Sequence, residues 1–345
     1  MEKNLKNMTM SRLRELMTIL DEKPYRGGQI FSWLSAGAGS VDEMSNLPVS
    51  LRNRLKEEGF YVGTLTTLKK QISETDGTRK YLLGLEDGNA IESVFMKYRY
   101  GNTLCVSSQA GCRMGCAFCA STIGGLCRGL TPAEMTGQID AAEKDTGEKI
   151  NHIVVMGSGE PFDNYDNLAD FMRIITDKNG RGMSMRHITV STCGIVPGIE
   201  RFAEDFPQAG RAISLHAADD DLRNKMMPVN RKYPLTELIP ACRRYAEKTS
   251  RRVTFEYTLI KGVNDSPEAA EKLSGLLRGM LCHVNIIPLN KVDETGYDTV
   301  SRREAEAFRD MLERSGVPST VRRELGDDID GACGQLRLGH ARAAD

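Results

Sequence analysis

Short apolar segments alternate with longer segments of helical periodicity from residue 104 onward, and this alternation constrains the fold more than any other feature of the sequence. Strands that alternate with helices indicate parallel βαβ units. Six such units predict an α/β fold, a partial (β/α)6 barrel, in which chemistry gathers at the carboxyl ends of the strands. The predicted strands span residues 104–107, 153–156, 188–191, 212–215, 253–259 and 284–288, and the predicted helices include residues 132–144, 168–176 and 235–248.

Two smaller units are expected before this barrel and a tail after it. Residues 1–60 predict an N-terminal helical accessory domain, with helices at 8–20, 30–34 and 48–59 and a polar turn at 23–28. Residues 61–98 alternate and contain Asp-Gly turn signals, which predict a β-meander extension. The barrel would then occupy residues 99–301, and residues 302–345 would hold a C-terminal helix at 303–314 and a loop with Cys333.

The overall charge gives no indication of a nucleic-acid partner. Of the 345 residues 27% are charged, and the net charge is −1 at pH 7. A polyanionic ligand would therefore require a local basic surface. Two candidate surfaces, for each of which an ordinary solvated face is the commoner explanation, are the run Arg243, Arg244, Lys248, Arg251, Arg252 and the pair Arg322, Arg323.

The nine cysteines do not suggest a disulfide framework. The N-terminus lacks the unbroken apolar region of a secretory signal, and no stretch approaches the roughly 20 apolar residues of a membrane helix, so we expect a cytoplasmic protein. Cysteines in such a protein are better explained as cluster ligands, catalytic thiols or buried apolar residues. Cys193, Cys242 and Cys282 lie in apolar segments and are expected in the core.

A C-x-x-x-C-x-x-C motif directly follows the first predicted barrel strand, at Cys112, Cys116 and Cys119. Thiolates are the usual ligands of iron–sulfur clusters. Three ligands for the four irons of a 4Fe–4S cluster leave one iron open, as a catalytic zinc site keeps an open position. That iron could chelate the amino and carboxylate groups of S-adenosylmethionine (SAM). The alternatives are three unrelated cysteines or a zinc site, which usually needs a second Cys or His pair.

Small and hydrogen-bonding residues follow the other predicted strands. The second strand ends at Gly159 and Glu160, where a glycine lets a ligand approach the backbone and a carboxylate can accept from an ammonium or a hydroxyl. Further polar ends are Ser191 after the third strand, Ser214-Leu215-His216 after the fourth and Asn290 after the sixth. Because the carboxyl ends of barrel strands share one rim, we expect these residues to form a SAM site beside the cluster loop.

These motifs together resemble the radical SAM adenine methyltransferases of RNA, the family of the RlmN-like and Cfr-like enzymes. The resemblance runs nearly from end to end. Its most specific segments are Cys105-Val106-Ser107-Ser108-Gln109, Gly159-Glu160-Pro161, Ser191-Thr192-Cys193-Gly194, Ser214-Leu215-His216-Ala217, Asn264-Asp265-Ser266 and Ala332-Cys333-Gly334-Gln335-Leu336. One departure is Ser158, where the commoner motif has Met, and we do not expect it to alter the chemistry.

The resemblance implies a reaction with two SAM molecules and a 4Fe–4S cluster. One SAM would methylate Cys333, and the radical made from the second would remove hydrogen from that methyl group. The resulting carbon would add to adenine, Cys105 would help to resolve the protein–RNA adduct, and Glu92 would accept a proton. The implied partners are 23S ribosomal RNA, transfer RNA and a flavodoxin- or ferredoxin-type electron donor.

The position of the methyl group on adenine divides the family. RlmN-like enzymes methylate carbon 2 and Cfr-like enzymes carbon 8. The N-terminal helical segment and the sequence from Cys105 to Gln109 favour carbon 2. Two other classes stay open: a radical SAM enzyme with another substrate, which would lack the Cys105 and Cys333 pair, and an RNA-binding protein with a structural zinc site.

Overall fold

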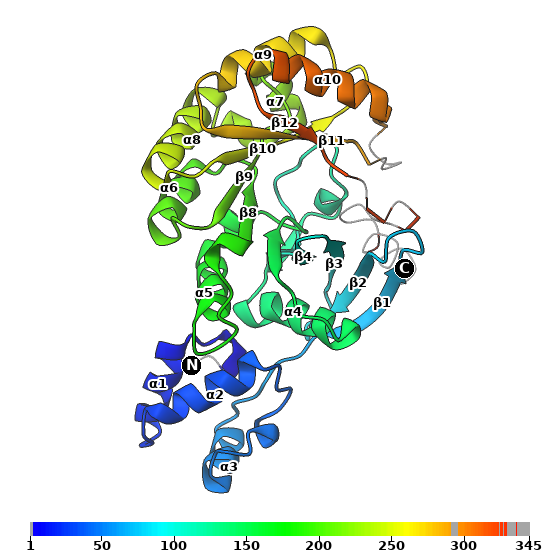
Figure 1. Cartoon of the computed structure of the whole chain (residues 1–345). Coiled ribbons are helices and arrows are strands. Elements are labelled where there is room, and N and C mark those ends of the chain that lie inside the picture. Colours follow the sequence, from blue (N-terminus) through cyan, green and yellow to red (C-terminus); the bar gives the residue numbers. More distant parts are fainter. Residues whose placement is uncertain (1–2, 291–295, 324, 327, 330–335, 337–345) are drawn as a thin grey trace.

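The computed structural model describes residues 3–290, 296–323, 325–326, 328–329 and 336. Within this part, ten strands form one sheet that is antiparallel from β1 to β4 and parallel from β4 to β12 (Figure 1). The result is the predicted partial (β/α)6 barrel with a β-extension, to which β12 adds one more parallel strand. In spatial order the strands are β1 (Thr66–Ile72), β2 (Arg79–Gly84), β3 (Ala90–Tyr98), β4 (Gly101–Cys105), β7 (His152–Val155), β8 (Ile188–Thr192), β9 (Gly210–Ser214), β10 (Val253–Leu259), β11 (Cys282–Pro288) and β12 (Ser319–Val321).

Helices cover the outer face of the parallel strands (Figure 1). Strand β10 shows why: Phe255 and Tyr257 pack in the main core, where Tyr257 stacks on Phe308 at a centroid distance of 5.5 Å. Glu256 and Thr258, at the alternate positions, line a cavity on the inner face. The helices are α4 (Pro132–Thr146), α5 (Tyr165–Thr176), α6 (Val196–Asp205), α7 (Asp220–Met226), α8 (Leu235–Thr249), α9 (Pro267–Leu277) and α10 (Arg302–Arg314).

The N-terminal helices have a core of their own, which Ile174 of α5 joins. They are α1 (Met10–Ile19), α2 (Tyr25–Ser35) and α3 (Val49–Glu57). The polar turn predicted at 23–28 is wrong, because α2 already begins at Tyr25. Gly27 is part of this helix, and a Cβ there would lie 2.7 Å from the backbone of Leu13, so the glycine allows α1 and α2 to pack closely.

The two strands of a small hairpin flank the cysteine motif, one before it and one after it. The hairpin consists of β5 (Gln109–Gly111) and β6 (Leu126–Gly129) and holds the intervening loop at its base. The tail runs from β12 to the β1–β2 turn, where the Glu74 N–H donates to Asp328 at 2.8 Å and the Gly326 N–H to Asp76 at 3.0 Å. No helix in the described part of the chain is long and apolar enough to cross a membrane.

Candidate functional site

A cavity of about 270 Å³ lies at the carboxyl ends of the parallel strands. It brings together nearly all the residues that the sequence predicted for a cluster and a SAM site. The predicted residues in its lining are Cys112, Cys116, Cys119, Gly159, Glu160, Ser191, Ser214, His216 and Asn290. Leu215 is the exception, because its side chain is fully buried in the main core and does not line the cavity.

All three cysteines of the motif line this cavity. Burial, and then the repulsion of a charged Cys119, raises the pKa of Cys112 to about 11, and burial raises the pKa of Cys116 as well. Thiolates crowded in this way are stabilised by a cationic centre. In the described residues no three Cys, His, Asp or Glu side chains converge on a single metal ion. An iron–sulfur cluster does not require its ligands to converge on one metal ion, since each thiolate binds a different iron. The three cysteines therefore fit a 4Fe–4S cluster.

The cysteine loop is closed tightly at its base. The Cys112 N–H donates to the Gly125 carbonyl at 2.9 Å. Gly111 has φ of 80°, and a Cβ there would lie 2.1 Å from the Gly125 oxygen, so any other residue would force the loop open.

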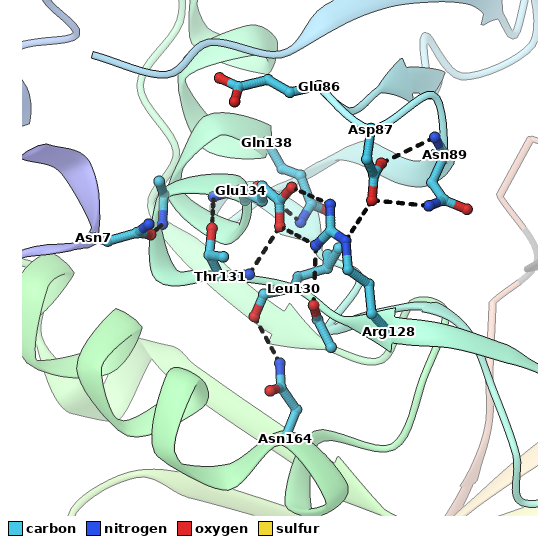
Figure 2. Close-up of polar contacts among 12 residues, drawn as sticks. Asn7, Glu86, Asp87, Asn89, Arg128, Leu130, Thr131, Glu134, Gln138 and Asn164 are labelled. Carbon is cyan, nitrogen blue, oxygen red and sulfur yellow. Dashed lines mark hydrogen bonds and ion pairs between the residues drawn. The ribbon is translucent and has the colours of Figure 1, made fainter. Parts of the chain in front are cut away.

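Arg128, on β6 just after the loop, joins this base to the rest of the protein (Figure 2). Its Nη1 and Nη2 donate to the two carboxylate oxygens of Glu134 at 2.8 and 2.6 Å, and its Nε donates to Asp87 at 2.5 Å. Glu134 also closes a capping box with Thr131 at the start of α4. The loop is thereby tied both to α4 and to the β2–β3 turn.

Glu160 is fully buried and connects the ends of β7 and β8. One carboxylate oxygen accepts from the Thr192 hydroxyl at 2.7 Å and the Phe162 N–H at 3.0 Å, and the other accepts from the Cys193 N–H at 2.7 Å. Burial raises the pKa of Glu160, and these donors oppose that effect. The preceding Gly159 has φ of 105°, and a Cβ there would lie 2.5 Å from Gln109.

His216 is held as a neutral imidazole. Its Nδ1 accepts the Thr258 N–H at 2.9 Å, which places the ring proton on Nε2. Burial, reinforced by the charge of Arg223, lowers the pKa of His216 to about 3. Its backbone has φ of 57°, and Asn264 supports this conformation by donating to the His216 carbonyl at 2.8 Å. Asn264, part of the sequence motif at 264–266, is thus a support for the cavity wall.

Glu92 and Cys105 lie on the same face of the sheet as the cavity, on the adjoining strands β3 and β4, but do not line it. Val94 pairs with Cys105 and, on the next strand, Leu82 pairs with Glu92, so Glu92 and Cys105 share one face of β3 and β4. The Nζ of Lys80 lies 3.2 Å from Glu92 on that face. Cys333 lies outside the described residues.

Sequence reasoning missed three buried charged residues around the site: Lys80, Arg223 and Glu256. Glu256 lines the cavity and accepts from the Asn285 side chain at 2.8 Å, and burial raises its pKa. Its position was open to prediction, because Thr254, Glu256 and Thr258 alternate with apolar residues along β10. Lys80 and Arg223 carry no such signal.

The two predicted basic surfaces differ in the structure. On α8, Arg244 pairs with Glu200 at 2.6 Å and Lys248 with Glu204 at 2.9 Å, so glutamates of α6 offset much of that run. Arg322, by contrast, lines the cavity.

Comparisons with known proteins agree with this geometry. The Radical SAM superfamily model matches residues 106–273, and the model of a ribosomal RNA large subunit methyltransferase N-terminal domain matches residues 3–60. A probable dual-specificity RNA methyltransferase RlmN of Clostridioides difficile is 52% identical over 333 residues, which are 96% of this chain and 97% of the relative. A protein of the same description from Pelotomaculum thermopropionicum is 53% identical over 336 residues, covering 97% and 91%. The crystal structure of a radical SAM methyltransferase from Sphaerobacter thermophilus superposes with a TM-score of 0.91 at 44% identity, over 97% of this chain and 99% of that one.

Proposed function

Because this chain belongs to the RlmN family of radical SAM RNA methyltransferases, we propose that it methylates carbon 2 of an adenine in 23S ribosomal RNA and in transfer RNA. The observation that carries the proposal is the convergence of three cysteines and four strand ends on one cavity, in a chain about half identical to such enzymes over nearly its full length. The description of the relatives as dual-specificity RNA methyltransferases supports two RNA substrates.

A 4Fe–4S cluster and SAM are the cofactors of this superfamily. When bound, the cluster supplies the electron that cleaves SAM to a 5′-deoxyadenosyl radical. We assign Cys112, Cys116 and Cys119 as its ligands, since all three line the cavity. A flavodoxin- or ferredoxin-type protein would be the electron donor.

The remaining rim residues would bind SAM. Gly159 leaves the backbone accessible and Glu160 supplies a carboxylate, while Ser191 and Ser214 offer hydroxyls 3.5 Å apart. Neutral His216 can donate from Nε2, and Asn290 can both donate and accept. Leu215 would contribute indirectly, by fixing its neighbours Ser214 and His216, because its side chain faces the core and its backbone groups bond to Glu256, Ala217 and Arg223.

Three residues would act on the methyl group and the RNA. In this proposal Cys333 receives a methyl group from SAM, and Glu92 accepts the proton lost from the adenine carbon. The Cys105 thiolate then attacks the Cys333 sulfur, so that a Cys105–Cys333 disulfide forms as the sulfur–carbon bond breaks. The electron pair of that bond leaves with the methylene carbon, which takes up a proton to become the methyl group of the product. The shared face of Glu92 and Cys105 supports this division of roles. The target adenine must leave its stack to enter the cavity, so an unpaired region is the expected target.

Mass spectrometry of nucleosides after an anaerobic reaction tests the proposal. The expected product is 2-methyladenosine in both RNAs, and Cys116→Ala should yield none. If 8-methyladenosine formed instead, the carbon assignment would be overturned and the Cfr-like alternative adopted.

A second experiment separates the two proposed catalytic thiols. Cys105→Ala should accumulate RNA joined covalently to protein, seen as a slow band that protease removes, whereas Cys333→Ala should give neither band nor product. Cys127→Ala is the matched control, because this exposed thiol on β6 lies outside the cavity lining and its loss should leave turnover unchanged. Normal product release by Cys105→Ala would contradict its role.

A further inference from the structure

Arg223 of α7 is fully buried, yet it is bound entirely by neutral groups. Its Nη2 donates to the carbonyls of Cys193 at 2.8 Å and Ser214 at 3.1 Å, and its Nε donates to that of Leu215 at 3.1 Å. Its Nη1 donates to the amide oxygen of Asn230 at 2.7 Å. One guanidinium therefore joins the ends of β8 and β9, the strands that carry part of the proposed SAM site.

Among the described residues, none of the hydrogen bonds of Arg223 goes to a carboxylate. Asp220 reaches Arg223 only through Asn230, whose Nδ2 donates to the Asp220 carboxylate at 2.8 Å. A cation that is buried without an ionised partner costs several kcal/mol, and burial accordingly lowers the pKa of Arg223. A group that offsets such a cost must carry negative charge in the same buried region.

The cysteine loop lies in that region. The Ala117 N–H donates to the carbonyl of Met226, the last residue of α7, at 2.9 Å. Met226 and Cys116 belong to one apolar cluster. Cys193, whose carbonyl accepts from Arg223, lines the same cavity as Cys116 and belongs to the same apolar cluster. A cluster bound through Cys116 would therefore add negative charge to the buried region that holds Arg223.

We propose that Arg223 is a positioning residue that sets the reduction potential of the cluster by placing a fixed, buried positive charge beside the cysteine loop. An electron added to the cluster is stabilised by a nearby cation, and in a water-poor environment that interaction is strong. The inference rests on the proposed function, which assigns Cys116 as a ligand.

The four hydrogen bonds explain why this charge is an arginine. A planar guanidinium can donate to several carbonyls at fixed angles, whereas an ammonium is a compact point charge on a flexible stem. Lysine at this position would retain the charge but could not hold both strand ends. Charge and geometry can therefore be separated by experiment.

The test is a redox titration of the reconstituted protein, followed by electron paramagnetic resonance of the reduced cluster without SAM or RNA. Arg223→Gln should lower the ratio of reduced to oxidised cluster at least tenfold at a fixed potential, which is 59 mV for one electron. Arg223→Lys should keep the ratio within threefold of the wild type but weaken SAM binding, measured by equilibrium dialysis, at least fivefold. Arg231→Gln is the matched control, because it removes the same charge from an exposed site where water and salt screen it.

Asp220→Asn gives an independent test in the opposite direction. The asparagine oxygen can still accept from Asn230 and from the Leu235 N–H, so the local structure is retained while one negative charge is removed. The reduced fraction should then rise, and this measurement decides the matter if Arg223→Gln does not fold. A wild-type potential in folded Arg223→Gln, or in Asp220→Asn, would overturn the inference. A wild-type protein that binds no cluster would instead overturn the proposed function.

Discussion

The ammonium nitrogen of Lys80 lies 3.2 Å from a carboxylate oxygen of Glu92, and both side chains are almost completely excluded from solvent, at 0% and 4% exposed. Lys80 pairs with Val94 across β2 and β3, so it lies diagonally opposite Glu92 on the same face. A buried ion pair contributes little net stability, but the removal of one partner leaves an uncompensated charge. The proposed proton acceptor is thus held beside a counter-ion.

Lys80→Met tests this relationship. Loss of the Lys80 counter-ion from Glu92 should destabilise the fold by about 3–5 kcal/mol, measured by urea unfolding of the cluster-free protein. RNA methylation should fall by at least 10²-fold, while SAM cleavage without RNA should persist. The double variant Lys80→Met, Glu92→Gln should recover most of the stability without recovering methylation. Equal destabilisation in the single and double variants would show that the pair does not act as a unit.

The wrong turn at residues 23–28 shows where sequence reasoning reached its limit in the fold. Two glycines after a proline are typical of a turn, yet Tyr25 begins a helix and Gly27 packs against the Leu13 backbone. The requirement for that glycine comes from α1, a contact that no local pattern records. The barrel strands, by contrast, were predictable because apolar runs and their spacing are local.

The residues of the candidate site likewise fall into those that a local sequence pattern reveals and those that it does not. Cys112, Cys116 and Cys119 are recognisable because their spacing within one loop is itself the signal. The burial of Arg223 cannot be recognised in the run from Asp219 to Lys225, because three of its four acceptors are carbonyls at strand ends 8 to 30 residues earlier. Lys80 is equally hidden, since a lysine in an alternating strand is ordinarily exposed.

The depressed pKa of His216 predicts a pH dependence of stability. The folded value is about 3 and the unfolded value about 6.5, so the unfolded state binds the proton first. The stability associated with the neutral ring is therefore complete above pH 6.5 and falls by about 1.4 kcal/mol for each pH unit below it, until about pH 3. His216→Asn, which tolerates the positive φ, should lose this slope in urea titrations.

The exposed His187 provides the control for that titration. His187→Asn should keep the wild-type slope between pH 5 and pH 6.5. A slope that survived in His216→Asn would mean that another group causes the acid sensitivity. SAM affinity in the wild-type protein should show no transition near pH 6.5, because His216 does not titrate there.

The contacts of Arg128 should determine how firmly the cysteine loop holds the cluster. Arg128→Lys keeps the charge but loses the fork that binds both oxygens of Glu134. The expected result is a severalfold faster transfer of iron to a chelator under anaerobic conditions.

Arg128 is also the main cause of the pKa of Asp87 falling to about 2. The stability that Arg128 contributes through ionised Asp87 is complete above about pH 4 and is lost as the pH falls toward 2. The increase in iron transfer caused by Arg128→Lys should therefore be constant from pH 6 to pH 8.

The control for Arg128 is Arg309→Lys. Arg309 makes a comparable contact with Asp310 on the exposed face of α10, away from the cluster loop. Its replacement should leave iron transfer at the wild-type rate. An unchanged rate in Arg128→Lys would show that the β5–β6 hairpin alone holds the loop.

Ser158 links the end of β7 to the cysteine loop, at a position where this chain departs from the commoner motif. Its hydroxyl lies 3.2 Å from that of Ser121, and both residues are buried. Ser158→Ala removes this hydrogen bond and should cost about 1 kcal/mol. Ser158→Met, which introduces the commoner residue, should cost about 1–3 kcal/mol, because the space is already filled in this chain.

Ser108 supplies the matched comparison for this last prediction. It is as deeply buried as Ser158, but within the described part of the chain its hydroxyl has no hydrogen-bond partner. Ser108→Ala should therefore leave the stability of the fold unchanged or increase it, since it removes a buried hydroxyl that has lost its hydration without gaining a hydrogen bond. Thermal unfolding of the cluster-free protein measures all three variants, and iron transfer should accelerate in Ser158→Ala but not in Ser108→Ala. Turnover per bound cluster should stay at the wild-type level in Ser158→Ala, because neither hydroxyl reaches the reacting atoms in the proposed mechanism. Destabilisation by Ser108→Ala without destabilisation by Ser158→Ala would contradict the link between β7 and the loop.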